Sequence, residues 1–239
     1  MIKKAVIFCG GKATRFNNGK PGPLKPLIKI NNEPIIIKII NIYAKKGVKD
    51  FILLGGYKFN ILHKFFEKKK IKKLNIKVVD TGINTETAGR LLKAKKIIGD
   101  DNFFLTYGDS ITDFDPIKAY KKFYKSKHAF LISIYKYISP YGVVKYKKNI
   151  LNSYSEKKFM FYINAGFYIF NKKLFKFIKS KNESLEKKTI PRILKNKINK
   201  ILIYKCKFWH PMDNQSDRSK LSKILKKWKV KFFWLGVEI

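Results

Sequence analysis

The chain has 239 residues, 45% of them hydrophobic and 15% aromatic, which is enough to bury a core and excludes an intrinsically disordered chain. Lysine and arginine number 54 against 16 acidic residues, a formal net charge of +38. The chain has only four arginines, at 15, 90, 192 and 218. Proteins that bind nucleic acids favour arginine, because it forms bidentate hydrogen bonds with phosphate and guanine. We therefore interpret the lysines as a solvated surface and keep binding of an anionic polymer as an alternative.

The cysteines and the apolar runs indicate the compartment. Cys9 and Cys206 are the only cysteines and imply no disulfide framework. The apolar run at the N-terminus is too short for a signal peptide, and no run reaches the roughly 18 apolar residues of a membrane span. We expect a reduced, cytoplasmic protein without a membrane span.

Strands and helices alternate through the first part of the chain. Short apolar runs that end near glycine predict buried strands, and the longer segments between them predict helices. In chain order, we expect strand 5–9, helix 35–46, strand 51–54, helix 59–69, strand 76–79, helix 88–98, strand 103–107, helix 116–125 and strand 129–135.

The pattern changes after residue 141, where short turns join neighbouring strands. We expect strands 142–146, 150–154 and 164–170, helices 171–179 and 187–197, strand 200–206 and a last helix 213–228. The whole predicts an α/β fold with a mixed, mostly parallel sheet flanked by helices and a small antiparallel part. We expect one domain over 1–239, with a nucleotide-binding part at about 1–135 and an acceptor-binding part at about 136–239.

The loop after the first strand is the first candidate site, because ligands of open α/β sheets lie beyond the carboxyl ends of the strands. It begins Gly10-Gly11 and has no glycine at 12, 13 or 14, which excludes the dinucleotide fingerprint. Gly19-Lys20 is followed by Pro21, which excludes a Walker phosphate loop.

What remains in this loop suits a phosphate chain. Two glycines allow backbone amides to approach an anion, Thr14 offers a hydroxyl, and Arg15 and Lys25 offer positive charge. Prolines on both sides stiffen the chain around Lys25. The alternative is a glycine turn that carries surface cations.

Two aspartates supply candidate metal ligands. Asp109 follows an apolar strand, and Asp213 follows the last one. Carboxylate oxygens suit Mg²⁺, which takes one or two protein carboxylates together with substrate phosphates. The alternatives are a turn residue at Asp109 and a helix cap at Asp213.

Several motifs in order along the chain resemble those of the sugar-phosphate nucleotidyltransferases. They include Gly10-Gly11-x-x-Thr14-Arg15, Lys25-Pro26 and Gly108-Asp109. Others are similar in particular to the glucose-1-phosphate cytidylyltransferases, namely Gly55-Gly56-Tyr57, Thr87-Ala88-Gly89-Arg90-Leu91, Ile163-Asn164-Ala165-Gly166-Phe167 and Phe208-Trp209-His210-Pro211-Met212-Asp213.

The resemblance implies a Rossmann-like nucleotidyltransferase fold and a Mg²⁺-dependent cytidylyltransferase. The reaction would join CTP to a phosphorylated acceptor, such as glucose 1-phosphate or a related sugar 1-phosphate, and give a CDP-linked product and pyrophosphate for capsule or lipopolysaccharide precursors. A homo-oligomer and no nucleic-acid partner are expected.

The resemblance also implies a role for each matching position. Asp109 and Asp213 would hold Mg²⁺, and Arg15, Lys25 and Lys157 would be catalytic, with Lys157 on the acceptor phosphate. Asn164 and Gly166 would line the acceptor pocket. The nucleotide would meet Gly10, Gly11, Thr14, Arg15, Lys25, Gly56, Arg90 and Gly108, the glycines approaching the base or ribose through their backbone.

The chain also departs from the family pattern. Ala13 replaces a glycine and is expected to restrict the first loop. Lys158 replaces a proline, and Ala165 replaces a glycine beside the acceptor. These changes lie mostly on the acceptor side, so an alternative is the same transfer to a non-sugar phosphate such as L-glutamine phosphate. A polybasic binding protein without catalysis is the second alternative.

Overall fold

The computed structural model describes residues 1–239 except 18, 127, 157–158, 197–199 and 234–239. The strands are β1 Lys4–Phe8, β2 Lys29–Ile30, β3 Glu33–Pro34, β4 Asp50–Gly55, β5 Asn75–Asp80, β6 Phe103–Tyr107, β7 Ser110–Thr112, β8 Phe130–Ile138, β9 Val143–Lys147, β10 Ile150–Ser155, β11 Met160–Phe170, β12 Ile201–Cys206 and β13 Trp209–Pro211. The helices are α1 Ile35–Ala44, α2 Phe59–Lys68, α3 Thr87–Lys93, α4 Lys95–Ile98, α5 Pro116–Ser126, α6 Ile190–Lys195 and α7 Gln215–Phe233, with helical turns η1 Thr14–Asn17, η2 Lys25–Leu27, η3 Lys172–Phe177 and η4 Leu185–Thr189.

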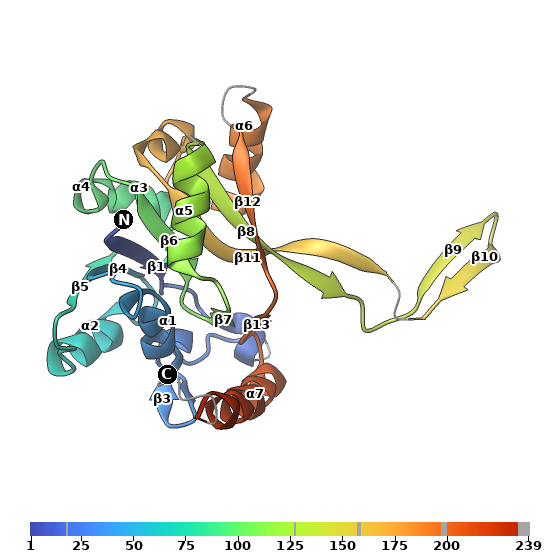
Figure 1. Cartoon of the computed structure of the whole chain (residues 1–239), viewed down its shortest axis with the longest axis horizontal. Coiled ribbons are helices and arrows are strands. Elements are labelled where there is room, and N and C mark those ends of the chain that lie inside the picture. The colour runs from blue at the N-terminus through green and yellow to red at the C-terminus, as the bar shows by residue number, and fades with distance from the viewer. Residues whose placement is uncertain (18, 127, 157–158, 197–199, 234–239) are drawn as a thin grey trace.

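Within the described residues, seven strands form one sheet in the order β12-β8-β11-β6-β1-β4-β5, and helices lie on both of its faces (Figure 1). Strands β6, β1, β4 and β5 are mutually parallel, and β12 is parallel to β8. Only β11 runs antiparallel to its neighbours β6 and β8. This confirms the predicted mixed, mostly parallel α/β sheet, and strands from both predicted parts of the chain join it.

The core lies on both faces of this sheet because the side chains of each strand alternate between them. In β1, Ala5 and Ile7 belong to the cluster on the α1 side, whereas Val6 and Phe8 belong to the cluster on the α3 side. A strand buried on both faces reads as an unbroken apolar run, which is why 5–9 was recognisable in the sequence.

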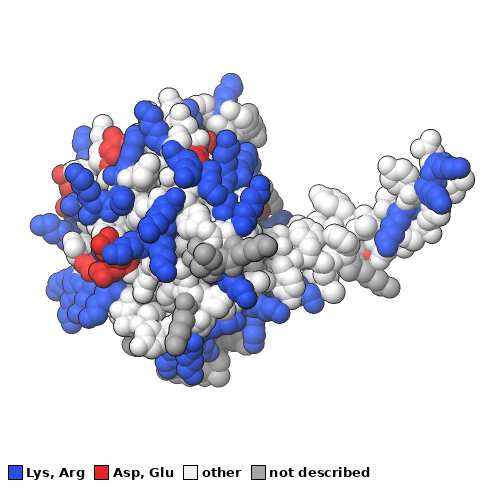
Figure 2. Space-filling view, turned by 90° about the horizontal axis from the view of Figure 1, so that it is seen from above, with Lys and Arg blue, Asp and Glu red and all other residues white. Residues whose placement is uncertain are grey.

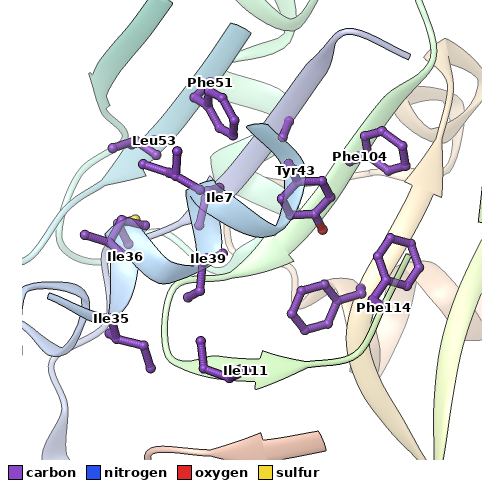
Figure 3. Packing of buried hydrophobic residues seen from close by; sticks show 14 of the residues in the cluster. Ile7, Ile35, Ile36, Ile39, Tyr43, Phe51, Leu53, Phe104, Ile111 and Phe114 are labelled. Atoms are coloured by element: carbon purple, nitrogen blue, oxygen red, sulfur yellow. The ribbon is translucent and has the colours of Figure 1, made fainter. Parts of the chain in front are cut away.

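Helix α1 is the most apolar helix next to the sheet. Four of its six isoleucines, at 35, 36, 39 and 40, and its Tyr43 are fully buried. Figure 3 shows Ile36, Ile39 and Tyr43 lying between the sheet and the segment that carries Ile111. An apolar helix of this kind is stable only when other parts of the chain cover it. The first loop and β7 pack in the same core cluster as α1 and are held in place by that packing.

Three predicted helices differ from the structure. The predicted helix 88–98 is divided into α3 and α4 at Ala94, and 171–179 forms only the 3₁₀ turn η3. The predicted 187–197 begins as the π turn η4 and continues as α6, and part of it lies outside the described residues. Pro191 has no N–H to donate, and the preceding Ile190 donates to Leu185 in a wide turn.

An antiparallel arm projects from the body between the end of β8 and the beginning of β11 (Figure 1). Its strands β9 and β10 match the predicted 142–146 and 150–154. Lys148 and Asn149 join them with positive φ at both residues, which is the two-residue turn that fits the twist of a hairpin. The arm exposes large apolar side chains, among them Val144, Tyr146, Ile150, Leu151 and Tyr154.

Basic side chains cover much of the face seen in Figure 2, and acidic ones form only small patches there. Among the described residues, no helix is long and apolar enough to cross a membrane.

The N-terminal end of α3 packs directly against the backbone of a distant segment. Ala88 donates its N–H to the Glu183 carbonyl at 3.0 Å, and Glu86 donates to the Lys181 carbonyl at 3.3 Å. A side chain at Gly89 would place its Cβ 1.9 Å from the Lys181 carbonyl oxygen. Glycine at 89 therefore allows the close contact between α3 and this segment.

Segment 181–183 has little freedom to move away from α3. The Glu183 carboxylate is buried and accepts hydrogen bonds from Arg192 and Thr189, each at 2.6 Å. Burial raises the pKa of Glu183, but these hydrogen bonds outweigh it and leave the pKa below its usual value. The segment is thus anchored through a charged side chain that stays ionised.

We expect Gly89→Ala to lower the free energy of unfolding by about 1–3 kcal/mol, because overpacking against a fixed carbonyl outweighs the roughly 1 kcal/mol that alanine gains in a helix. Urea denaturation measures the difference. Gly11→Ala is the matched control, since no atom of the described residues lies within 4 Å of its added Cβ. Equal losses in the two variants would contradict the steric assignment.

Candidate functional site

The carboxyl ends of β1 and β6 open onto a cavity of about 600 Å³. Because Phe8 of β1 pairs with Tyr107 of β6, the loops that follow these two strands start side by side. Among the sequence-predicted site residues, the cavity is lined by Gly10, Gly11, Thr14, Arg15, Lys25, Arg90, Gly108 and Asp109. The first loop therefore forms one wall of a cleft.

Lys25 lies between the two predicted metal ligands. Its Nζ donates to Asp213 Oδ1 at 2.8 Å and to Asp109 Oδ2 at 3.3 Å. Its side chain is only 11% exposed. Arg15 reaches the other oxygen of Asp213 at 3.2 Å, but its side chain is 81% exposed, so water weakens that pair. Arg15, Lys25, Asp109 and Asp213, four of the predicted charged residues, thus belong to one cluster.

Two short strands bring Asp213 to Asp109. Strand β13 pairs with β7, which directly follows Asp109, and the Met212 N–H donates to the Asp109 carbonyl at 2.8 Å. The Asp213 N–H then donates to the Asp217 carboxylate in the first turn of α7. Asp213 is therefore fixed on both sides and points its carboxylate at Lys25.

The Lys25 ammonium offsets the negative charges of Asp109 and Asp213 by direct contact. Burial raises the pKa of the Asp109 carboxyl; the Lys25 ammonium opposes this rise, and the Asp213 carboxylate adds to it. Two carboxylates this close need a cation between them to stay ionised together. In this structure the Lys25 ammonium supplies that charge.

The two aspartates also fit a divalent metal ion. Both already contact one cation, and their hard oxygen atoms are the donors that Mg²⁺ prefers. Among the described residues, no group of three or more His, Cys, Asp and Glu side chains could hold a metal. The rest of the coordination shell would come from phosphate oxygens and water, as is usual for Mg²⁺.

Arg90 forms part of the cavity wall and joins the ends of three strands. Its guanidinium donates to the carbonyls of Gly10, Gly55 and Gly82 and to the hydroxyl of Thr81, at 2.6–3.1 Å. These acceptors follow or end β1, β4 and β5, and the side chain is only 6% exposed. The structure therefore places the Arg90 charge against backbone carbonyls.

The neighbouring glycines make room for this guanidinium. A Cβ at Gly10 would lie 2.4 Å from Arg90 Nη1, and a Cβ at Gly56 would lie 2.3 Å from it. Gly56 is not among the residues that line the cavity, whereas Gly11 borders open space there. Of these glycines, Gly11 is the one whose backbone a ligand can approach freely.

Asn164 and Gly166 lie beside the cavity wall, and neither lines the cavity. Asn164 donates to the Tyr168 hydroxyl at 2.7 Å and accepts the Gly166 N–H at 3.0 Å. The space next to Gly166, which has φ +76°, is filled by the ring of Tyr107 at 2.9 Å from an added Cβ. Tyr107 itself lines the cavity.

Sequence reasoning missed the partner of Tyr107. The Tyr107 hydroxyl donates to Glu186, which also accepts from Thr87 at 3.1 Å and Ser184 at 3.0 Å. Burial and the nearby carboxylate raise the pKa of Tyr107 well above its usual value, so it remains a donor. One signal was available: acidic residues are rare in this chain, which makes each one a candidate for a specific contact.

Lys157 lies outside the described residues. Cys9 and Cys206 are buried and free, and burial raises the pKa of the Cys206 thiol to about 11, as expected for inert core residues.

Ala13 adopts the left-handed conformation in the first loop, with φ +53°. Its carbonyl accepts the Phe16 N–H at 3.1 Å, and the adjacent Lys12 carbonyl accepts the Gly22 N–H at 2.9 Å. Alanine therefore occupies a conformation that strains any side chain, and restriction of the loop by Ala13 stays a prediction.

Comparison with known proteins shows which family the chain belongs to. The nucleotidyl transferase family matches residues 4–215. A probable glucose-1-phosphate cytidylyltransferase of Bacillus subtilis is 29% identical over 95% of this chain and 99% of its own length. A mannose-1-phosphate guanyltransferase of Hypocrea jecorina is 32% identical over 80% of this chain and 56% of its own. The solved inositol-1-phosphate CTP transferase of T. maritima has the same fold, with TM-score 0.71 and 16% identity over 95% of this chain and 96% of its own.

We expect Ala13→Gly to raise the free energy of unfolding by about 0.5–1 kcal/mol, because relief of the left-handed strain exceeds the added entropy of the unfolded chain. Ala13→Val should lower it, since a β-branched side chain tolerates this conformation least. Thermal and urea unfolding of the three proteins test the order Gly, Ala, Val. The reverse order would show that the loop changes conformation freely at residue 13.

Proposed function

This chain belongs to the nucleotidyl transferase family, and we propose that it is a Mg²⁺-dependent cytidylyltransferase that joins CTP to a sugar 1-phosphate such as glucose 1-phosphate. The products are pyrophosphate and a CDP-linked sugar. The CDP-linked sugar serves capsule or lipopolysaccharide synthesis. The observation that carries the proposal is the Lys25 ammonium held by Asp109 and Asp213 at the cavity edge. The choice of CTP follows the relative from Bacillus subtilis.

The chemistry requires charge control and little proton transfer. A sugar phosphate is already largely dianionic near pH 7, since its second pKa is about 6, so the nucleophile needs no general base. The obstacle is repulsion between this dianion and the triphosphate, together with alignment for in-line attack on the α-phosphorus. A site for this reaction must therefore gather positive charge around both reactants.

The residues of the cavity can meet this requirement. Arg15, being exposed, can swing from Asp213 to the leaving pyrophosphate, and Lys25 can shift from the carboxylates to the phosphate chain. Thr14 and the open backbone of Gly11 offer further hydrogen bonds. Asp109 and Asp213 would hold Mg²⁺, which when bound offsets negative charge on the α-phosphate.

Arg90 and Glu186 hold the loops and the side chain that carry this machinery. Arg90 fixes the loops after β1 and β4 through their carbonyls, so Gly10 and Gly11 keep one conformation. Glu186 holds the Tyr107 hydroxyl, and Tyr107 directly precedes the Gly108-Asp109 pair. Both act as positioning residues, because they hold the groups that face the substrates.

We expect Asp109→Asn and Asp213→Asn each to lower kcat/KM at least about 10²-fold, the scale of losing a principal electrostatic stabiliser. EDTA should abolish pyrophosphate release and Mg²⁺ should restore it, with Asp213→Asn requiring more Mg²⁺. Asp101→Asn, which removes an exposed carboxylate at the opposite end of β6, is the matched control and should keep full activity. Unchanged rates in both site variants would refute the metal assignment.

A panel of nucleotides and acceptors tests the substrates. We expect release of pyrophosphate to be at least about tenfold faster with CTP and glucose 1-phosphate than with GTP, UTP or dTTP, the scale of discrimination that binding contacts supply. L-glutamine phosphate replaces the sugar phosphate in a parallel series. A preference for it would keep the cytidylyl transfer and change the acceptor. No release with any pair, combined with tight, salt-sensitive binding of an anionic polymer, would favour the polybasic binding protein.

A further inference from the structure

A second hollow, of about 330 Å³, lies between the β2–β3 turn and α7, which are neighbours at one end of the body (Figure 1). We call it the basic groove and define it by Lys29, Asn31, Arg218, Ser222, Lys223 and Lys226. It is separate from the cavity at the ends of β1 and β6, because the two share no lining residue.

The helical period places the α7 cations of the basic groove on one face. Ser222 and Lys226 are four residues apart, Lys223 and Lys226 are three apart, and Arg218 precedes Ser222 by one turn. Lys29 faces them from β2. No acidic residue lines the groove, and no ion pair of these four cations occurs among the described residues. Four unpaired cations repel one another, so an anion between them lowers the energy.

Hydrogen bonds hold the floor of the basic groove in place. Ser222 Oγ donates to Asn31 Oδ1 at 2.6 Å, and Asn31 Nδ2 donates back to the Ser222 carbonyl at 3.1 Å. Arg218 Nε donates to the Lys29 carbonyl at 3.1 Å, which orients the guanidinium and leaves its two terminal nitrogens for a ligand. A guanidinium held in this way is suited to a phosphate group, which it can bind with two parallel hydrogen bonds.

The basic groove is built from the same segments as the catalytic ion pair. Lys29 lies four residues beyond Lys25, and Arg218 lies five residues beyond Asp213. Asp217, next to Arg218, accepts the N–H of Asp213 at 3.0 Å. A ligand that draws β2 and α7 together therefore acts on the 2.8 Å contact between Lys25 and Asp213.

We propose that the basic groove binds a small molecule with a multiply charged phosphate group and that its occupation changes the rate of the reaction at the cavity. The proposed binding is independent of the proposed function, whereas the proposed effect on rate rests on that function. The four cations favour a polyphosphate chain or a phosphate ester over a monovalent anion.

Lysine footprinting tests the binding on the intact protein. Inorganic tripolyphosphate at about twice its Kd should slow acetylation of Lys29, Lys223 and Lys226 about threefold, as occupancy requires. Lys220 and Lys227 are exposed on the same helix outside the groove and should be unaffected. Sodium chloride at equal ionic strength should protect none of them.

Equal protection of Lys220 and Lys227, or protection by sodium chloride alone, would overturn the site, because both are signs of general screening. Protection by a single-stranded oligonucleotide but not by tripolyphosphate would overturn the small-ligand assignment. These readouts need no turnover, so they remain valid if cytidylyl transfer is not found.

Kinetics at saturating CTP and acceptor test the effect on rate. The double variant Lys223→Gln/Lys226→Gln should change the response of kcat to tripolyphosphate at least about twofold, and Lys220→Gln/Lys227→Gln should leave it as in the parent protein. Competition by tripolyphosphate at the cavity is the same in the parent protein and in both double variants, so it cancels in the comparison. Identical responses would refute the link between the groove and the cavity.

Discussion

The contact of one ammonium with two carboxylates organises the site. Lys25 and Asp213 are 188 residues apart in the sequence, and Lys25 and Asp109 are 84 apart. Without the Lys25 charge, the two carboxylates would repel each other at the edge of the sheet, where water is partly excluded. The 3₁₀ turn at 25–27, the β7–β13 pairing and the first turn of α7 all serve to hold these three groups together.

Arg90 shows a second use of positive charge inside this basic protein. Its guanidinium is compensated by backbone carbonyl dipoles, and no carboxylate within the described residues forms an ion pair with it. Carbonyl groups at the ends of three parallel strands converge on the Arg90 guanidinium. A planar guanidinium carries several N–H donors and can hydrogen-bond several carbonyls at once. The glycines at 10 and 56 are needed because the fork fills the space that side chains would take.

The small number of acidic residues gives each of them weight. In a chain with 54 basic side chains, 16 acids cannot neutralise the surface, and several are used at specific contacts. Glu183 anchors the segment under α3, Glu186 holds Tyr107, and Asp217 caps the backbone at Asp213. Most lysines, by contrast, remain solvated, and this is why a high net charge said little about function.

The sequence by itself determined the strands of the sheet, because buried parallel strands read as apolar runs. It also determined the charged residues of the first loop, because they lie next to glycines and prolines. It also indicated Asp109, which directly follows a strand, and the family to which the motifs point. Only the tertiary structure decided that Arg90 faces carbonyls, that Glu186 meets Tyr107, and that Lys29 and Arg218 share a groove. Those contacts join residues from distant segments, and neither hydrophobic period nor local turn chemistry carries information about which side chains meet across the fold.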